Sequence, residues 1–270
     1  MPKRHTTVLT VAGSDSGGGA GIQADLKTVA AHGCYGTTAI TAITVQNTLG
    51  VTAIHPVPVE IVTAQIEAVL ADIGADAVKI GMLFSPELVE AVAATLKRFA
   101  VKNIVLDPVM VAQSGDKLLR DEAVAALKEK LIPMATLITP NLPETAALLE
   151  RGEIGAAEMA ETARQLARLG CRGVLVKGGH LTGDRRDDLL FWAAKNRIVN
   201  LPGTAIATTN NHGTGCTLSA AIAARLALGE DMETAARAAK DYINGALTAG
   251  AAYQLGQGHG PVQHFFRFWP

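Results

Sequence analysis

The chain has 270 residues, of which 49% are hydrophobic and 18% are charged, and its formal net charge is -1. This composition predicts a globular protein with a large core and differs from that of disordered chains. The balanced charge gives no electrostatic case for nucleic acid or a membrane surface, because those partners require a concentrated excess of Lys and Arg. We therefore expect a small, locally recognised ligand.

The cysteines and the N-terminus indicate in which cellular compartment the protein is expected. Cys34, Cys171 and Cys216 are far apart and form no C-x-x-C pair, so reduced thiols are expected rather than disulfides or zinc ligands. The longest stretch without Asp, Glu, Lys or Arg, residues 28–59, is interrupted by glycines and polar side chains, which excludes a membrane span. The basic N-terminus precedes too short an apolar segment for a signal peptide. We expect a cytoplasmic protein.

Short β-branched runs alternate with longer segments of helical periodicity along the chain. The predicted strands are 6–13, 76–83, 103–107, 136–141 and 173–179, the predicted helices are 20–33, 85–99, 121–131 and 142–150, and a hairpin is predicted over 189–201. This alternation predicts an α/β fold with a mainly parallel sheet covered on both faces. No linker or fixed-period repeat interrupts it, so we expect one domain over residues 1–270.

The helix predicted at 85–99 has the clearest signals. Ser85 can cap its first turn, and Pro86 suits the position that follows. Apolar residues from Leu88 to Phe99 recur at helical spacing, which predicts that this face packs into the core.

Polar residues follow the carboxyl ends of several predicted strands. Ligands of open parallel sheets bind at these ends, where the loops toward the helices lie. Asp107 and Asn141 could instead cap or end turns, and Lys177 could be solvated. The residues that we expect to share one rim are Gly13, Asp15, Asp107, Asn141, Glu144 and Lys177.

The glycine-rich segment AGSDSGGGAGIQADL, residues 12–26, fits neither common nucleotide-loop template. A P-loop requires Gly-Lys followed by Ser or Thr, and the dinucleotide fingerprint requires a glycine where Ile22 stands. A flexible turn that leads into a helix is the simpler interpretation. Asp25, on the first turns of that helix, could still accept hydrogen bonds from a ligand amine or hydroxyl.

The segment HGTGCTLSAAIAARLALG, residues 212–229, predicts an anion site. Gly213, Thr214 and Gly215 allow a tight turn with convergent N–H groups, and the following helix adds its own unpaired donors and positive dipole end. The same field would lower the pKa of the Cys216 thiol and favour the thiolate. A cysteine is more often a small buried hydrophobe, but this combination indicates an anion that is made or moved beside a proton acceptor.

Eight segments in order carry a resemblance to a known family. They are AGSDSGGGAGIQADLK, AITVQNT, VKIGML, VLDPVMVAQSG, TPNLPE, VLVKGGH, HGTGCTLSAAIA and GHGPV. Together they resemble the hydroxymethylpyrimidine and hydroxymethylpyrimidine phosphate kinases of thiamin biosynthesis, within the ribokinase-like superfamily. Many superfamily members carry an aspartate base after the glycine turn, whereas this subgroup and some pyridoxal kinases carry cysteine, as at Cys216. The resemblance implies a ribokinase-like three-layer α/β/α sandwich, the use of ATP and Mg²⁺, and a homodimer.

The resemblance also implies a role for each site residue. Phosphoryl transfer requires donors for the moving phosphoryl group, a cation and an acceptor for the hydroxyl proton. The implied catalytic residues are Gly213, Gly215, Lys177 and the base Cys216; Asp107 and Glu144 would hold Mg²⁺; Asn141, Lys177 and Thr214 would contact ATP; and Gly13, Asp25, Val45, Gln46, Met82 and Val109 would surround the pyrimidine. A glutamine amide offers the donor and the acceptor that an aminopyrimidine edge requires, although buried amides more often pair with backbone.

The implied activity is phosphorylation of 4-amino-5-hydroxymethyl-2-methylpyrimidine and then of its monophosphate. Three alternatives stay open. A pyridoxal or pyridoxine kinase has the same fold, but Gln46 and Met82 favour the aminopyrimidine. A non-catalytic pyrimidine sensor would need neither a metal nor a proton acceptor. Acyl transfer by Cys216 would require a histidine base, for which His212 is the only close candidate in sequence.

Overall fold

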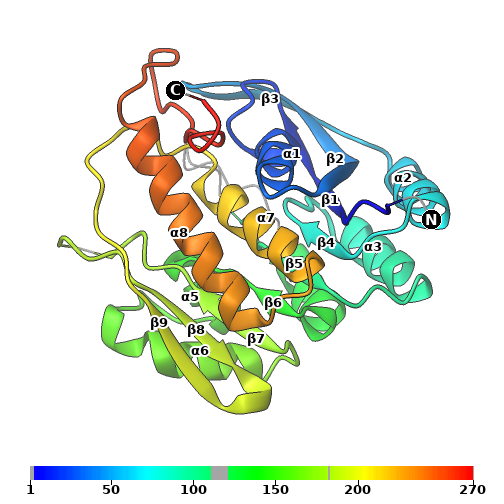
Figure 1. The fold of residues 1–270 in the computed structure, drawn as a ribbon. Helices are drawn as coiled ribbons and strands as arrows, with labels where there is room; N and C mark the ends of the chain where they lie inside the picture. The colour runs from blue at the N-terminus through cyan, green and yellow to red at the C-terminus, as the bar shows by residue number, and fades with distance from the viewer. Residues whose placement is uncertain (1–2, 111–120, 182, 270) are drawn as a thin grey trace.

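The computed structural model describes residues 3–110, 121–181 and 183–269, and its centre is a nine-stranded sheet (Figure 1). The strands are β1 (Thr7–Asp15), β2 (Tyr35–Asn47), β3 (Gly50–Pro56), β4 (Ala77–Ile80), β5 (Ile104–Leu106), β6 (Leu137–Ile138), β7 (Gly173–Val176), β8 (Asp188–Trp192) and β9 (Arg197–Leu201). Their order in the sheet is β3-β2-β1-β4-β5-β6-β7-β8-β9. The pairs from β2 to β7 are parallel, whereas β3, β8 and β9 join by antiparallel pairing.

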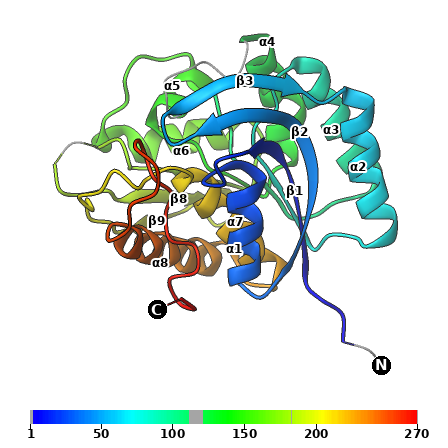
Figure 2. The same cartoon turned by 90° about the horizontal axis from the view of Figure 1, so that it is seen from above.

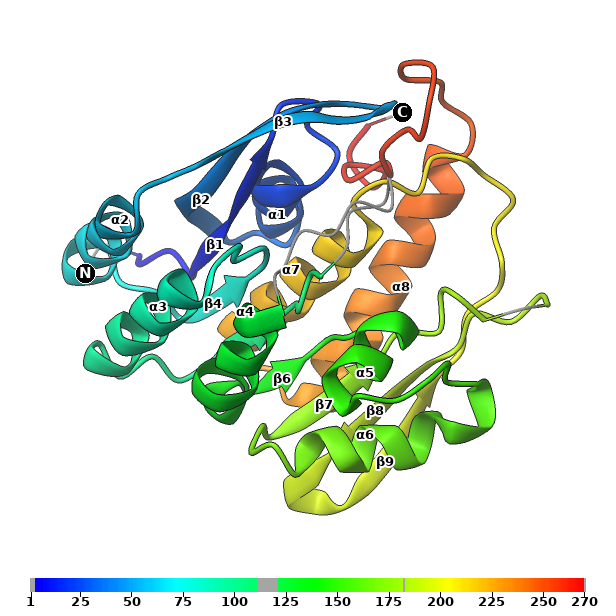
Figure 3. The same ribbon diagram turned by 180° about the vertical axis from the view of Figure 1, so that it is seen from behind.

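Helices cover both faces of this sheet. They are α1 (Gly21–Ala31), α2 (Val59–Asp72), α3 (Pro86–Arg98), α4 (Asp121–Ala126), α5 (Leu142–Leu149), α6 (Met159–Ala167), α7 (Thr214–Ala227) and α8 (Met232–Gly250). Helices α1, α7 and α8 lie on one face (Figure 1), and α2 to α6 lie on the other (Figure 3). The three-layer α/β/α sandwich with a mainly parallel sheet is therefore confirmed.

Helix α7 is the most deeply placed helix of its layer. It packs against α1 and α8 and against β1, β4 and β5. Its residues from Thr217 to Ala224 are all buried, which explains why the sequence there is apolar on every side rather than on one stripe. The first turn of α7 is consequently held in a fixed position at the carboxyl ends of the parallel strands.

The signals predicted for the helix at 85–99 act as expected. The Ser85 hydroxyl accepts a hydrogen bond from the Leu88 N–H at 3.3 Å, and Pro86 occupies the first position of α3. Leu88, Val92 and Leu96 have no exposed surface and belong to the core between α3 and the sheet. The apolar stripe at helical spacing therefore marks the buried face.

Two segments differ from the sequence prediction. Residues 35–56 form the β2–β3 hairpin, which curves over the sheet (Figure 2), and its tip contacts the C-terminal segment through the His259 N–H and the Thr48 carbonyl at 2.8 Å. The helix predicted at 121–131 begins as α4 and then widens into a π-helical turn at Leu127–Leu131. Residues 111–115, which end the segment VLDPVMVAQSG, lie outside the described residues.

None of the helices in the described ranges combines the length and the apolar character that crossing a membrane requires.

Candidate active site

A cavity of about 790 Å³ opens where the parallel strands end. Loops after β1, β4, β5, β6 and β7 and the start of α7 contribute to its wall, as the strand-end argument predicts. The predicted site residues that line it are Gly13, Gln46, Met82, Asp107, Val109, Asn141, Glu144, Lys177, Gly213, Thr214, Gly215 and Cys216. A second cavity of about 680 Å³, between the loops at 207–210 and 251–258, contains none of them.

The turn before α7 is built so that only glycine fits at its centre. Gly213 caps the helix in the left-handed conformation, with φ at +79°, and a Cβ atom there would lie 1.8 Å from the Gly19 carbonyl oxygen. A Cβ atom on Gly215 would lie 3.3 Å from Lys177 Nζ and 3.5 Å from Asp107 Oδ2. The unpaired N–H groups at the start of α7 therefore lie directly beside the charged floor of the cavity.

That floor consists of Lys177 between two carboxylates. Lys177 Nζ lies 2.8 Å from Asp107 Oδ1 and 3.7 Å from Glu144 Oε2. Burial by itself opposes the charge on all three groups, but the mutual attraction raises the pKa of Lys177 and lowers the pKa of Asp107. For Glu144 burial dominates, and together with the nearby Asp107 charge it raises the pKa to about 7.

The two acids share one lysine, so the floor has an excess of negative charge whenever both are ionised. A divalent cation would relieve that excess, and Mg²⁺ commonly takes one or two carboxylates together with water and phosphate oxygens. Within the described residues, no group of three or more His, Cys, Asp or Glu side chains is arranged to hold a metal. The donor set of Asp107 and Glu144 fits Mg²⁺ of this kind.

Asn141 and Glu144 also form the cap of α5. The Asn141 side-chain oxygen accepts from the Glu144 N–H at 2.8 Å, and Glu144 Oε2 accepts from the Asn141 N–H at 2.7 Å. The capping role that competed with a ligand role for Asn141 is thus observed, while the residue still lines the cavity. The cap also fixes the Glu144 carboxylate toward Lys177.

Cys216 lies in the first turn of α7 and lines the cavity, but the prediction for its acidity is wrong. Burial raises the pKa of the thiol to about 11, and the nearby Lys79 charge opposes this only in part. The field of a helix start acts over a short range, and here the loss of hydration outweighs it. The resting group is a thiol.

The predicted ligand-binding role of Asp25 is also wrong, because its side chain cannot touch a ligand in the cavity. Its side chain has no exposed surface, and Oδ2 accepts from Thr10 Oγ1 at 2.5 Å and from Lys79 Nζ at 2.8 Å. It sits on the inner face of α1, beneath the cavity wall. Lys79 on β4 also lines the cavity; from the sequence alone its role is ambiguous, because a lysine near a strand end can be solvated, and it is not among the predicted site residues.

Val45 does not line the cavity and remains 58% exposed. Successive side chains of a strand point to opposite faces, so the face that carries Thr44 and Gln46 toward the cavity turns Val45 away. The other predicted apolar residues, Met82 and Val109, do line the cavity. A Cβ atom on Gly13 would lie 2.7 Å from the Met82 methyl group, so the glycine makes room for Met82.

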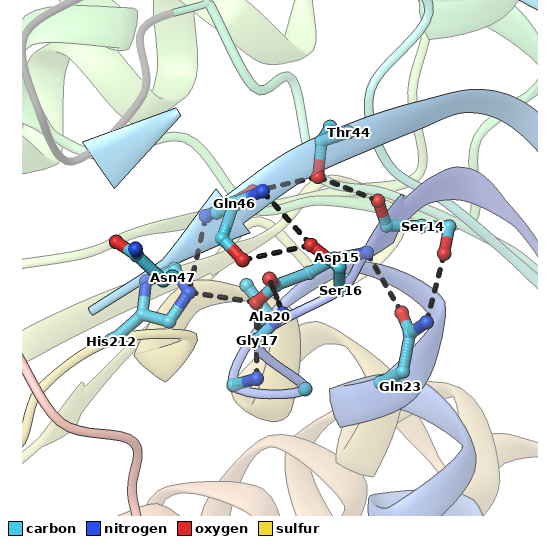
Figure 4. Close-up of polar contacts among 12 residues, drawn as sticks. Ser14, Asp15, Ser16, Gly17, Ala20, Gln23, Thr44, Gln46, Asn47 and His212 are labelled. Atoms are coloured by element: carbon cyan, nitrogen blue, oxygen red, sulfur yellow. Dashed lines mark hydrogen bonds and ion pairs between the residues drawn. The ribbon is translucent and has the colours of Figure 1, made fainter. Parts of the chain in front are cut away.

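A hydrogen-bond network joins the two glycine-rich loops (Figure 4). Asp15 Oδ1 accepts from the Gly17 N–H at 2.8 Å, and Oδ2 accepts from the N–H groups of Gly19 at 3.0 Å and Ala20 at 2.8 Å. His212 Nε2 lies 2.9 Å from Asp15 Oδ2. Since His212 directly precedes Gly213, Asp15 fixes the first loop against the turn that begins α7.

The opposite end of the cavity has a different character. Lys240 on α8 donates to Asp188 Oδ2 and to the Arg186 carbonyl, both at 2.8 Å. The apolar side chains that line the cavity near this buried pair are Ile206, Ile243 and Leu247. The cavity thus extends from the charged floor at the start of α7 to a region beside α8 that combines this buried ion pair with apolar side chains.

Comparison with known proteins places the chain in a family. Residues 15–263 match the family model described as phosphomethylpyrimidine kinase. The chain belongs to the phosphomethylpyrimidine kinase family. It is 55% identical over 262 residues to the hydroxymethylpyrimidine/phosphomethylpyrimidine kinase of Rhizobium meliloti, a match that covers 97% of both chains. Membership of this family makes the chain a kinase, which removes the sensor and acyl-transfer alternatives.

Two further relatives add detail. The thiamine biosynthesis bifunctional protein ThiED of Geobacter sulfurreducens is 51% identical over 264 residues, which cover 97% of this chain and 53% of that protein. The solved structure of an ADP complex of Bacillus subtilis pyridoxal kinase is 38% identical and has a TM-score of 0.89, with 97% of this chain and 98% of that chain covered. The family and this neighbour together support the use of ATP.

Proposed function

We propose that this kinase transfers the γ-phosphoryl group of ATP to the hydroxyl group of 4-amino-5-hydroxymethyl-2-methylpyrimidine and then phosphorylates the resulting monophosphate to the diphosphate, in thiamin biosynthesis. The observation that carries the proposal is that Gly215 at the start of α7, Lys177 and Asp107 meet in one cavity. Cys216 lines the same cavity one residue beyond Gly215.

The turn at 213–215 and Lys177 form the phosphoryl-binding part of the proposed site. As the bond between the γ-phosphorus and the bridging oxygen breaks and the bond to the substrate oxygen forms, charge spreads over the phosphoryl oxygens. N–H groups at the start of α7 and the Lys177 ammonium would stabilise that charge without rearrangement. Asn141 and Thr214, on either side of this position, would contact the nucleotide phosphates.

Cys216 is the proposed proton acceptor. The substrate hydroxyl loses its proton as the new bond to phosphorus forms, and the thiolate form of Cys216 would take that proton to become a thiol. Because burial raises the pKa of Cys216 to about 11, only a small part of the protein holds the thiolate at neutral pH. Lys79, whose charge favours the thiolate, would assist this ionisation.

Mg²⁺ is the proposed metal, held by Asp107 and Glu144 through oxygen atoms or bound waters. When bound, it would neutralise phosphate charge during transfer. Asp107 is kept in place by Thr139 Oγ1 at 3.2 Å as well as by Lys177. Removal of Mg²⁺ with a chelator should abolish turnover, and added Mg²⁺ should restore it.

The pyrimidine would bind at the end of the cavity formed by Gly13, Gln46, Met82 and Val109. Met82 and Val109 offer an apolar slot for the ring faces, and the Gln46 amide offers a donor beside an acceptor for the ring edge. The adenine would lie beside the apolar side chains Ile243 and Leu247 of α8. In the second step the substrate phosphate would replace the hydroxyl group as acceptor beside the same turn.

Three further expectations are part of the proposal. The 270 residues would act as one domain, in the cytoplasm, as a homodimer. The apolar side chains of Ile43 and Val45, 51% and 58% exposed on β2, support a surface that a second copy could cover. Activity on pyridoxal or pyridoxine is the alternative, which the fold shared with the Bacillus subtilis enzyme favours.

A coupled assay of ADP release tests the proposal. With MgATP, we expect turnover with the pyrimidine alcohol, then with its monophosphate, and a lower kcat/KM with pyridoxal. A strong preference for pyridoxal would reject the pyrimidine assignment. Turnover with the alcohol but not with the monophosphate would reject the second phosphorylation alone.

A further inference from the structure

The side-chain amide of Gln46 is held between two polar groups on the cavity wall (Figure 4). Its oxygen lies 3.1 Å from Thr44 Oγ1, and its nitrogen lies 3.3 Å from His212 Nε2. The main chain of Gln46 is fixed as well, because Ser16 Oγ accepts from the Gln46 N–H at 2.9 Å and donates to the Gln46 carbonyl at 2.8 Å. With the main chain fixed, rotation about the last side-chain bond is the simplest change that exchanges the amide oxygen and nitrogen between these two contacts.

The Thr44 hydroxyl donates its proton to a group other than Gln46. Thr44 Oγ1 lies 2.8 Å from the Ser14 carbonyl oxygen, which can only accept, so the hydroxyl proton must point there. What Thr44 presents to Gln46 is then a lone pair. A lone pair requires the amide NH₂ group on that side, not the amide oxygen.

The proton on His212 leads to the same requirement. Asp15 Oδ2 accepts from two backbone N–H groups, and although burial opposes its charge, hydrogen bonds from His212 and the loop backbone lower the Asp15 pKa. An ionised Asp15 only accepts, so the His212 Nε2 atom 2.9 Å away carries a hydrogen in either charge state of the ring. That hydrogen points to Asp15, so the Gln46 amide nitrogen, 3.3 Å from the same ring nitrogen, meets an N–H group and gains no hydrogen bond, whereas the amide oxygen in its place would share the hydrogen with Asp15.

We propose that Asp15, His212 and Thr44 lock the Gln46 amide with its oxygen toward His212 and its NH₂ group toward Thr44. One rotation of 180° gives the amide NH₂ group a hydrogen bond to the Thr44 lone pair and replaces the contact between two N–H donors at His212 by a shared hydrogen bond, so both contacts favour it. These three side chains are positioning residues, since they act on the substrate through Gln46.

An amide fixed in one orientation pairs with only one order of donor and acceptor on the edge of the substrate ring. This step rests on the proposed function. The outer edge of the amide presents its acceptor on the His212 side and its donor on the Thr44 side. With the 4-substituent of the ring on the His212 side, as the proposal requires, this edge pairs with an exocyclic amino group beside a bare ring nitrogen. The 4-oxo analogue, with a ring carbonyl beside a ring N–H, presents the opposite pattern. A freely rotating glutamine would accept both edges, so the lock is what confers discrimination.

Steady-state kinetics with MgATP measures this discrimination. The two substrates are the aminopyrimidine alcohol and 5-hydroxymethyl-2-methylpyrimidin-4-one, and the readout is the ratio of their kcat/KM values. We expect the wild-type ratio to favour the amino compound by about a hundredfold or more. His212→Phe keeps a planar ring but removes the donor, and we expect the ratio to fall by about tenfold or more, because only the Thr44 contact then opposes the reversed amide.

The ratio of the two kcat/KM values separates this role from a merely structural one, since any damage to the phosphoryl site lowers the kcat/KM values of both substrates together. His5→Phe, at an exposed position, is the matched control and should leave the ratio unchanged. An unchanged ratio in His212→Phe, or equal wild-type turnover of both compounds, would overturn the lock. A wild-type protein that phosphorylates neither compound would instead refute the proposed function.

Nuclear magnetic resonance of the wild-type protein tests the orientation without catalysis or substitution. The Gln46 carboxamide protons should show stronger nuclear Overhauser effects to the Thr44 methyl group than to the His212 ring protons. The reverse intensities would overturn the lock, whatever the kinetic result.

Discussion

Lys79 Nζ lies 2.8 Å from Asp25 Oδ2, and neither side chain has any exposed surface. The pair joins β4 to α1 directly beneath the cavity, and Asp25 Oδ1 has no hydrogen-bond partner among the described residues. A buried charge whose partner is removed is costly, because nothing else compensates its lost hydration. Lys79 is therefore a structural requirement as well as a source of positive charge near Cys216.

Lys79→Met should lower the free energy of unfolding by about 3–5 kcal/mol, because it leaves the Asp25 carboxylate buried without a counter-charge. Urea denaturation followed by circular dichroism measures the change. Arg197→Met is the matched control, since Arg197 pairs with Glu233 at 3.1 Å on the surface, and it should cost less than about 1 kcal/mol. Adding Asp25→Asn to Lys79→Met should recover part of the loss. Equal effects of Lys79→Met and Arg197→Met would contradict the argument.

Glu144 should make stability depend on pH. Burial raises its folded-state pKa from 4.5 to about 7, so between these values the folded state binds more protons than the unfolded state. The free energy of unfolding should therefore fall as pH rises through this window, by at most about 1.4 kcal/mol per pH unit from this group. Glu144→Gln removes the titration but retains an acceptor for the cap of α5.

The difference between wild type and Glu144→Gln isolates the effect, since Asp107 and Lys177, the charged neighbours of Glu144, titrate outside this pH range. Unfolding by urea at several pH values from 4.5 to 8 should give a difference that changes in favour of the variant as pH rises. Parallel curves for the two proteins would show that Glu144 titrates at an ordinary pKa when folded.

Cys216→Ala should reduce kcat by about 10²–10⁴-fold if the thiolate is the general base. ATP should still bind to this variant in calorimetry, because the donors of the turn are backbone groups. Cys216→Asp should retain part of the activity, since a carboxylate can also accept the proton. Unchanged activity in both variants would refute the base role.

The pH dependence of kcat/KM gives a second test of the base role of Cys216. Because the thiol pKa is raised to about 11, the thiolate fraction grows throughout the alkaline range below that value. Wild-type kcat/KM should therefore rise with pH up to the limit of stability, and Cys216→Asp should lack this rise. A wild-type profile that is flat above pH 8 would exclude a required thiolate in the free enzyme.

Gly213→Ala should damage the phosphoryl site more than its backbone strain alone explains. Gly33 provides the control, since its φ of +77° nearly equals the +79° of Gly213 but no atom lies within 4 Å of its added Cβ. Gly33→Ala should cost about 1–2 kcal/mol with unchanged kcat, as expected for left-handed strain. Gly213→Ala should have a lower Tm than Gly33→Ala and a lower kcat than wild type, because its Cβ displaces the Gly19 backbone. Matching Tm and kcat values would contradict this.

Much of the fold follows from local patterns. The apolar stripe of α3 depends on spacings of three to four residues, and the turn before α7 depends on glycine. Both signals are visible in the sequence. The β2–β3 hairpin was not predicted, because its residues alternate weakly and only pairing with β1 and the C-terminal segment stabilises it. The π-helical turn after α4 likewise has no local signal.

The sequence by itself determined which residue types follow the strand ends and which glycines precede the helix at 214, since these depend only on order along the chain. The tertiary structure decided which of them face the cavity. It turned Val45 outward, paired Asp25 with Lys79, brought Asp15 to His212 across 197 residues of sequence, and buried Cys216 enough to keep its thiol protonated. The physical reason is that exposure and pKa depend on the elements that cover a side chain, and these are distant in sequence.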